Sequence, residues 1–161
     1  MPANADLEKR APFYTLGEEI TNAITHGIGA GLAIAGMIIL LVRSKDVWQV
    51  VSSAVYGASM IFLFLMSCLY HALTNPTAKK VFRVFDHTSI FFLIAGTYTP
   101  FTLVTLRGWV GWTVFGVVWG AAVIGIILTA IDMERFKVFS MICYLAMGWC
   151  VVVTWKPMTQ A

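Results

Sequence analysis

Four polar side chains lie near one another in the sequence, where two apolar segments adjoin: Ser67, His71, Asp86 and His87. Ser67 and His71 have the spacing i and i+4, so on a helix they share one side and could contact one ligand. Neutral imidazole is the commonest protein ligand for metals, and a catalytic zinc needs about three protein ligands, a water and a carboxylate near that water. These residue types indicate a metal site with His71 as a ligand and Asp86 as the partner of the water.

Each of these side chains also has a structural explanation. A single histidine near a helix end is often an interfacial residue, and Ser67 could bond a carbonyl of its own helix or let two helices pack closely. Asp86, just before Thr88, could lie in the N-cap region of a helix, where the helix dipole favours a carboxylate. For His87 we prefer the structural explanation.

The elements that would position these residues are apolar helices. Hydrophobic residues make up 59% of the 161 residues, charged residues make up 12%, and the mean hydropathy is +0.81. Five stretches without Lys, Arg, Asp or Glu are long enough to cross a bilayer, which takes about 18 residues or more. They are 23–42, 47–73, 88–106, 108–131 and 138–155. Unbroken apolar runs in lipid must be helical, so we expect an all-α polytopic transmembrane bundle between an N-terminal segment, 1–22, and a short tail, 156–161.

Lysine and arginine are unevenly divided between the two sides of these helices, with seven on one side and four on the other. The first set is Lys9, Arg10, Lys79, Lys80, Arg83, Arg135 and Lys137, and the second is Arg43, Lys45, Arg107 and Lys156. Segments rich in Lys and Arg next to membrane helices tend to remain in the cytoplasm. We therefore predict a multi-pass protein of the cell (plasma or inner) membrane whose N-terminal segment is cytoplasmic. The opposite ends carry interfacial tryptophans, namely Trp48, Trp109, Trp112 and Trp155.

This topology gathers the polar residues at one face. The first span begins, the second ends and the third begins on the cytoplasmic side. The residues expected there are Glu18, Glu19, Asn22, His26, Ser67, His71, Asp86 and His87. Ionisable groups near the membrane tend to be functional, which favours a site over separate structural roles.

Other features of the sequence are structural or exclude a class of protein. The formal charge of +3 comes with no long basic stripe, which argues against a nucleic acid partner. The GxxxG spacings Gly27–Gly31 and Gly116–Gly120 would allow helices to approach closely. Pro100, inside the third span, is predicted to kink its helix.

Three stretches carry motifs that occur together in one family. Glu19–His26 reads EITNAITH and fits E-x-x-N-x-x-x-H, and Ser67–His71 reads SCLYH and fits S-x-x-x-H with Asp86 downstream. Ala95–Phe101 reads AGTYTPF and is similar to a third-helix segment. From about Tyr14 to Trp155 the chain resembles the hemolysin III family, the bacterial branch of the progestin and adiponectin receptor (PAQR) superfamily.

The resemblance implies seven helices, an intracellular N-terminus and a zinc ion. The zinc would be held by His71 and by two histidines of an H-x-x-x-H motif on the seventh helix, with Asp86 holding the metal-bound water. This sequence ends at Ala161 after five predicted spans and contains no H-x-x-x-H motif, so two of the three implied ligands are missing. We therefore expect a truncated or fragmentary member with a zinc site only partly encoded, in which His26 or His87 could substitute locally.

Three functions remain open at this point. The first is a zinc-dependent membrane hydrolase of an amide-bearing lipid, ceramidase-like by resemblance, or a lipid-responsive receptor, with Ser67 supporting the polar group of the substrate. The second is a membrane-permeabilising hemolysin that causes cytolysis, although polar groups concentrated at one end argue against a constitutive channel. The third is an inactive fragment that contacts membrane lipids only, or that requires a partner chain to supply the missing helices.

Overall fold

The computed structural model describes the backbone of residues 14–159 and the side chains of residues 14–152. Residues 1–13 of the predicted N-terminal segment and residues 160–161 of the predicted tail lie outside the described residues. The helices are α2 (Leu16–Arg43), α3 (Val47–Ala72), α4 (Pro76–Pro100), the π-helix η1 (Phe101–Leu106), α5 (Gly108–Ile131) and α6 (Lys137–Thr159). No strand occurs within this described range.

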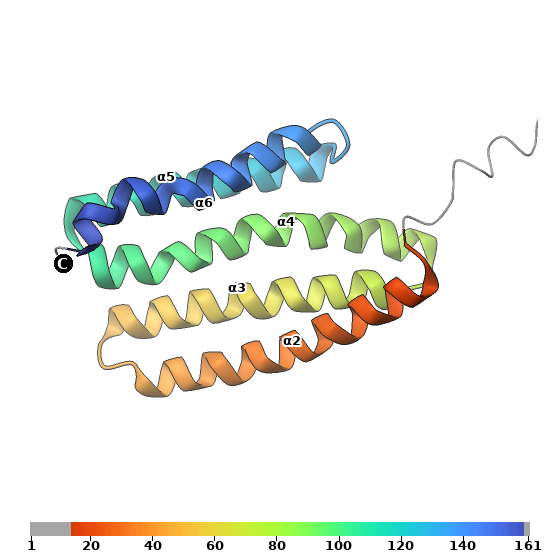
Figure 1. Ribbon diagram of the computed structural model, residues 1–161, viewed down its shortest axis with the longest axis horizontal. Coiled ribbons are helices and arrows are strands. Elements are labelled where there is room, and N and C mark those ends of the chain that lie inside the picture. The colour runs from red at the N-terminus through yellow and green to blue at the C-terminus, as the bar shows by residue number, and fades with distance from the viewer. Residues whose placement is uncertain (1–13, 160–161) are drawn as a thin grey trace, which may run out of the picture.

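The helices lie side by side along one common long axis (Figure 1). Short turns join α2 to α3 and α3 to α4, so successive helices run in opposite directions, and α5 and α6 pack together beyond α4. Four segments are long and apolar enough to cross a membrane: Leu16–Arg43, Val47–Ala72, Pro76–Leu106 and Gly108–Ile131. The described part of the last helix, Lys137–Val152, is shorter and also apolar.

Large apolar side chains cover the outside of this bundle. Ile28, Ile124 and Leu145 are 60%, 55% and 61% exposed, and similar residues occur along every helix. A water-soluble protein seldom exposes apolar surface on this scale, whereas a bilayer favours it. The chain is therefore an all-α helical membrane bundle that contacts membrane lipids, as the sequence predicts.

The helix α4 begins earlier than the apolar run predicts. The sequence suggested a basic loop before Thr88, but the structure is helical from Pro76 onward. The Oδ1 atom of Asn75 accepts hydrogen bonds from the backbone amides of the next turn, and Pro76 occupies the first helical position, where no N–H is needed. Asp86 consequently lies well inside α4, and its interpretation as an N-cap residue is wrong.

The helix α2 also begins before its apolar run, at Leu16 rather than at Ala23. Thr15 and Glu18 form a capping box, in which the hydroxyl of Thr15 accepts from the backbone N–H of Glu18 and the carboxylate of Glu18 accepts from that of Thr15. This cap fixes the first turn and places Glu19, the next residue, on a rigid helix.

The π-helix η1 follows directly after Pro100. The sequence predicted a kink at this proline, and the structure shows a change from α- to π-helical bonding there. Proline has no N–H to donate, so one hydrogen bond of the regular α-helical pattern is lost at this residue. A π-helix inside a longer helix is rare and is frequent at functional sites.

The most deeply buried cluster joins α4, α5 and α6 through Phe91, Val118, Ala122 and Met147. Close helix approaches occur at glycines other than those of the GxxxG spacings. A Cβ atom built on Gly125 would collide with the ring of Phe91. A Cβ atom on Gly27 would lie in ordinary contact, 3.6 Å from Sγ of Cys68, and one on Gly31, Gly116 or Gly120 would meet no described neighbour within 4 Å. The GxxxG spacings therefore do not mark the tight contacts of this part of the chain.

Replacing Gly125 by alanine is expected to lower the free energy of unfolding by about 1–3 kcal/mol, since the added methyl overpacks a ring that is 0% exposed. Gly120→Ala on the same helix is the matched control and should leave the stability unchanged or slightly raised. Unfolding of both variants in detergent, followed by circular dichroism, measures the difference. Equal stability of the two variants would show that the packing of α5 against Phe91 is looser than described.

Candidate functional site

One end of the bundle gathers the ionisable residues of the predicted site. The start of α2, the end of α3 and the start of α4 meet there, at the right-hand end of Figure 1. Glu19 and His26 come from α2, His71 from α3, and Lys79 and Asp86 from α4. The antiparallel turn between α3 and α4 therefore brings residues from three helices to a single end.

Glu19 links the three helices through its two carboxylate oxygens. Oε2 lies 2.7 Å from Nδ1 of His71, and Oε1 accepts a hydrogen bond of 2.6 Å from Nζ of Lys79. The side chain of His71 is 6% exposed and that of Glu19 is 14% exposed. An ionised carboxylate only accepts hydrogen bonds, so Nδ1 of His71 carries the proton and Nε2 is the nitrogen left to bind something else.

Aromatic rings surround the imidazole of His71 and hold its orientation. Tyr14 meets it edge-on with ring centroids 5.2 Å apart, and Tyr70 lies 4.7 Å away on the same helix. The ammonium group of Lys79 lies 5.2 Å from the centroid of Tyr70. The carboxylate and these rings together leave His71 little freedom to rotate.

His26 is the nearest second imidazole. Its ring stacks on that of His71 with centroids 6.1 Å apart and planes 10° apart, and Phe64 lies on it at 5.9 Å. Nδ1 of His26 is buried and has no hydrogen-bond partner among the described residues. Asp86 is close enough to act electrostatically on this ring. A buried imidazole nitrogen without a partner is unusual, and a water, an ion or a group outside the described residues could bond to it.

The other predicted residues lie nearby without joining this pair. Ser67 is 4% exposed and lies one turn before His71 on α3. Asp86 forms no hydrogen bond or ion pair with His71 among the residues described, and its Oδ2 lies 3.6 Å from Nδ1 of His87. Asn22 lies on α2 between Glu19 and His26, and Glu18 is engaged in the helix cap.

His87 belongs to a different environment from His71. Its Nδ1 lies 3.0 Å from the carbonyl oxygen of Arg83, and its own carbonyl accepts a hydrogen bond from the hydroxyl of Tyr144. It lines a cavity of about 460 Å³ between α4, α5 and α6, which Tyr14 and Tyr70 also line on the side of His71. This placement favours the structural explanation for His87, whereas His26 is the histidine that neighbours His71.

The described residues fit part of a metal site. The pairing of Glu19 with Nδ1 of His71 is the arrangement by which a carboxylate usually orients a metal-binding histidine. However, no three His, Cys, Asp or Glu side chains converge on one point within the described range, whereas a catalytic zinc needs about three protein ligands. This part of the chain holds one oriented imidazole with a second imidazole beside it, and a zinc ion bound there would need further ligands from outside the described residues.

Sequence reasoning missed Lys79, Tyr14 and Tyr70 as members of this cluster. Lys79 served only in the charge count, yet it bonds a carboxylate 60 residues away in the sequence. No local pattern signals a contact at such a distance. Tyr70, by contrast, adjoins His71 in the sequence, so its proximity to the imidazole was available without the structure.

These features define a class of protein: a multi-pass helical membrane protein with a histidine and carboxylate cluster at one end of the bundle. The family model described as "Haemolysin-III related" matches residues 14–161, and the chain belongs to this family. Two curated bacterial relatives have names that refer to hemolysin-3. "Hemolysin-3" of Bacillus cereus is 47% identical over 146 residues, covering 89% of this chain and 67% of the relative.

Two further relatives are less similar to the chain, one from a bacterium and one from humans. The "Hemolysin-3 homolog" of Bacillus subtilis (strain 168) is 40% identical over 148 residues, covering 90% of this chain and 70% of the relative. The human "Monocyte to macrophage differentiation factor" is 29% identical over 147 residues, covering 87% of this chain and 62% of the relative. No solved structure is significantly similar to the chain.

Proposed function

We propose that this chain carries the His71 side of a zinc site in a membrane hydrolase that cleaves an amide-bearing lipid. The observation that carries the proposal is the 2.7 Å contact between Glu19 and Nδ1 of His71, which fixes the tautomer and directs Nε2 outward from the pair. A histidine with only an interfacial role has no need of a buried carboxylate partner.

The residues of this chain would have separate roles at this end of the bundle. Glu19 holds the ring of His71, and Lys79 neutralises the second oxygen of Glu19. Asp86 would orient a water and accept its proton at a carboxylate oxygen, and Ser67 would support the polar group of the substrate. Bound zinc would lower the pKa of its water to about 7 and polarise the substrate carbonyl.

The remaining ligands would come from additional helices, either in a longer chain or in a partner. The curated hemolysin-3 relatives are longer than the part that this chain matches, which supports the idea of further helices. The N-terminus would be cytoplasmic, because seven of eleven basic residues flank the ends of the helices on that side.

Chelation tests the proposal directly. The chain, together with the additional helices that supply the remaining ligands, is reconstituted with zinc in phosphatidylcholine vesicles that contain a fluorescent ceramide analogue, and release of the fatty acid is followed before and after treatment with EDTA. We expect hydrolysis that disappears with the chelator and returns with added zinc. Hydrolysis that is unaffected by EDTA, or absent altogether, would contradict the proposal for this chain.

Dye leakage from the same vesicles separates the hydrolase from a membrane-permeabilising protein, the function that the names of the relatives suggest. Leakage that needs no zinc and survives Ser67→Ala, His71→Ala and Asp86→Ala would favour permeabilisation and contradict a role for this cluster. Hydrolysis without leakage would support the hydrolase.

A further inference from the structure

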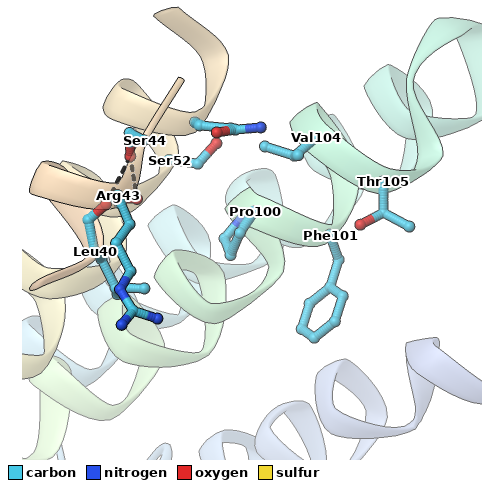
Figure 2. A pocket seen from close by; sticks show the side chains of 10 residues that line it. Leu40, Arg43, Ser44, Ser52, Pro100, Phe101, Val104 and Thr105 are labelled. Carbon is cyan, nitrogen blue, oxygen red and sulfur yellow. Dashed lines mark hydrogen bonds between the residues drawn. The ribbon is translucent and has the colours of Figure 1, made fainter. Parts of the chain in front are cut away.

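An open pocket with both polar and apolar walls lies at the end of the bundle opposite to the histidine cluster. It has a volume of about 300 Å³ and is lined by the end of α2, the start of α3 and the junction of α4 with η1. Figure 2 shows Arg43 on one side of this pocket and Phe101 on the other, with Pro100 between them. All of the lining residues belong to the described part of the chain.

Hydroxyl groups are concentrated in this pocket. Ser52 is 1% exposed, and its Oγ is buried without a hydrogen-bond partner among the described residues. The Oγ atoms of Ser44 and Ser53 lie 3.3 Å apart, and Ser44 also donates to the carbonyl oxygen of Leu40 at 2.8 Å. A hydroxyl left unbonded inside a protein costs about 1–3 kcal/mol, so Ser52 indicates a partner that the chain itself does not supply.

The charge of the pocket is positive. Arg43 lines it and is within ion-pair distance of no carboxylate in the described range. The nearest acid along the chain, Asp46, is committed elsewhere: Oδ1 accepts from the backbone N–H of Gln49 and Oδ2 from Arg107. The hydrogen bond from Gln49 is the main influence that lowers the pKa of Asp46, so this acid stays ionised as a helix cap.

The position of the pocket places it at the depth of lipid headgroups. Trp48 and Trp112 pack edge-to-face at the same end of the bundle with ring centroids 5.9 Å apart, and both are largely exposed. Exposed tryptophans are typical of the boundary between hydrocarbon and headgroups. The apolar side chains of Leu40, Phe101 and Val104 form the rest of the wall, so the pocket is polar on one side and apolar on the other.

We propose that this pocket binds the phosphate group of a membrane phospholipid. Arg43 pairs with the phosphate oxygens, as arginine commonly does. The hydroxyl of Ser52, which has no partner among the described residues, donates to one of the same oxygens, and an acyl chain lies against Phe101 and Val104. Pro100, which has no backbone N–H, and the wider π-helical turn of η1 form this side of the site. The proposal is independent of the zinc site at the other end.

Native mass spectrometry of the purified chain in detergent doped with phosphatidylglycerol tests the proposal. We expect one retained phospholipid, and a dissociation constant about tenfold larger for Arg43→Gln, which removes a charge-assisted contact. Lys45→Gln is the matched control, because Lys45 lies two positions away and does not line the pocket. Arg43→Lys should recover part of the affinity. Equal weakening by Arg43→Gln and Lys45→Gln would overturn the proposal.

Two further ligands identify which part of the lipid is recognised. Inorganic phosphate at millimolar concentration should not displace phosphatidylglycerol, because it lacks an acyl chain, and diacylglycerol should not be retained, because it lacks the phosphate. Displacement by inorganic phosphate would identify a site for the free ion and overturn the assignment to a lipid. Retention of diacylglycerol equal to that of phosphatidylglycerol would overturn recognition of a phosphate.

Ser52→Ala separates a ligand contact from a purely structural role. Without phosphatidylglycerol the variant should be as stable as the parent or more so, because it removes an unbonded buried hydroxyl. With the lipid, its dissociation constant should rise about threefold to tenfold, the effect of losing one hydrogen bond. An unchanged dissociation constant for the lipid would remove Ser52 from the site and contradict the proposed geometry.

Discussion

Glu19→Ala is expected to lower the free energy of unfolding of the bundle by about 2–4 kcal/mol. Glu19 accepts from both His71 and Lys79, and these three residues belong to three different helices. Removing the carboxylate breaks two charge-assisted hydrogen bonds and leaves a partly buried ammonium group without its partner. Unfolding in mixed micelles, followed by circular dichroism, measures the loss.

Two further variants test the physical reason for this loss. Glu18→Ala removes a carboxylate from the same first turn, but that carboxylate is exposed and only caps α2, so the loss should be much smaller. Adding Lys79→Met to Glu19→Ala should recover part of the stability, because it removes the unpaired charge. If Glu18→Ala and Glu19→Ala were equally destabilising, the link between the three helices would contribute nothing beyond helix capping.

The apolar runs predict the helices well because the bilayer permits few alternatives for an unpaired backbone. They fail at the helix ends, where helices extend into water. The α4 helix begins at Pro76, yet a search for uncharged residues starts it at Thr88, because Lys79, Lys80 and Arg83 interrupt the run. The pair Asn75–Pro76 is itself a helix-start signal. The residue types at this position therefore indicate where α4 begins, which hydropathy alone does not.

The site is predictable in its location and not in its contacts. Antiparallel helices place Glu19, His71 and Asp86 at one end whatever their rotations, and the sequence therefore predicts their common face. Rotation of each helix about its axis decides which of them touch. This rotation is set by packing between helices, such as that of Gly57 against Met37 on α2. For this reason Glu19 pairs with His71, and Asp86 forms no direct bond to it.

When the additional helices complete the ligand set, His71→Ala is expected to raise the dissociation constant for zinc by about 100-fold or more, since it removes the one oriented imidazole among the described residues. Glu19→Gln should weaken zinc binding by about 10- to 100-fold while keeping the size of the side chain, because the imidazole loses its carboxylate partner. Equilibrium dialysis with zinc, followed by elemental analysis of the purified protein, measures both effects without an activity assay.

His87→Ala is the control for both variants, because His87 lies at the same end of the bundle and is 3.6 Å from Asp86, but forms no hydrogen bond or ion pair with Glu19 or His71 in the described part of the chain and bonds the backbone of Arg83. Its zinc affinity should equal that of the parent. His26→Ala distinguishes two forms of the site: a loss as large as that of His71→Ala would make the stacked imidazole a second ligand, and no loss would leave it a neighbour. Equal zinc content in the parent and in His71→Ala would remove His71 from any metal site and contradict the function proposed for this end of the bundle.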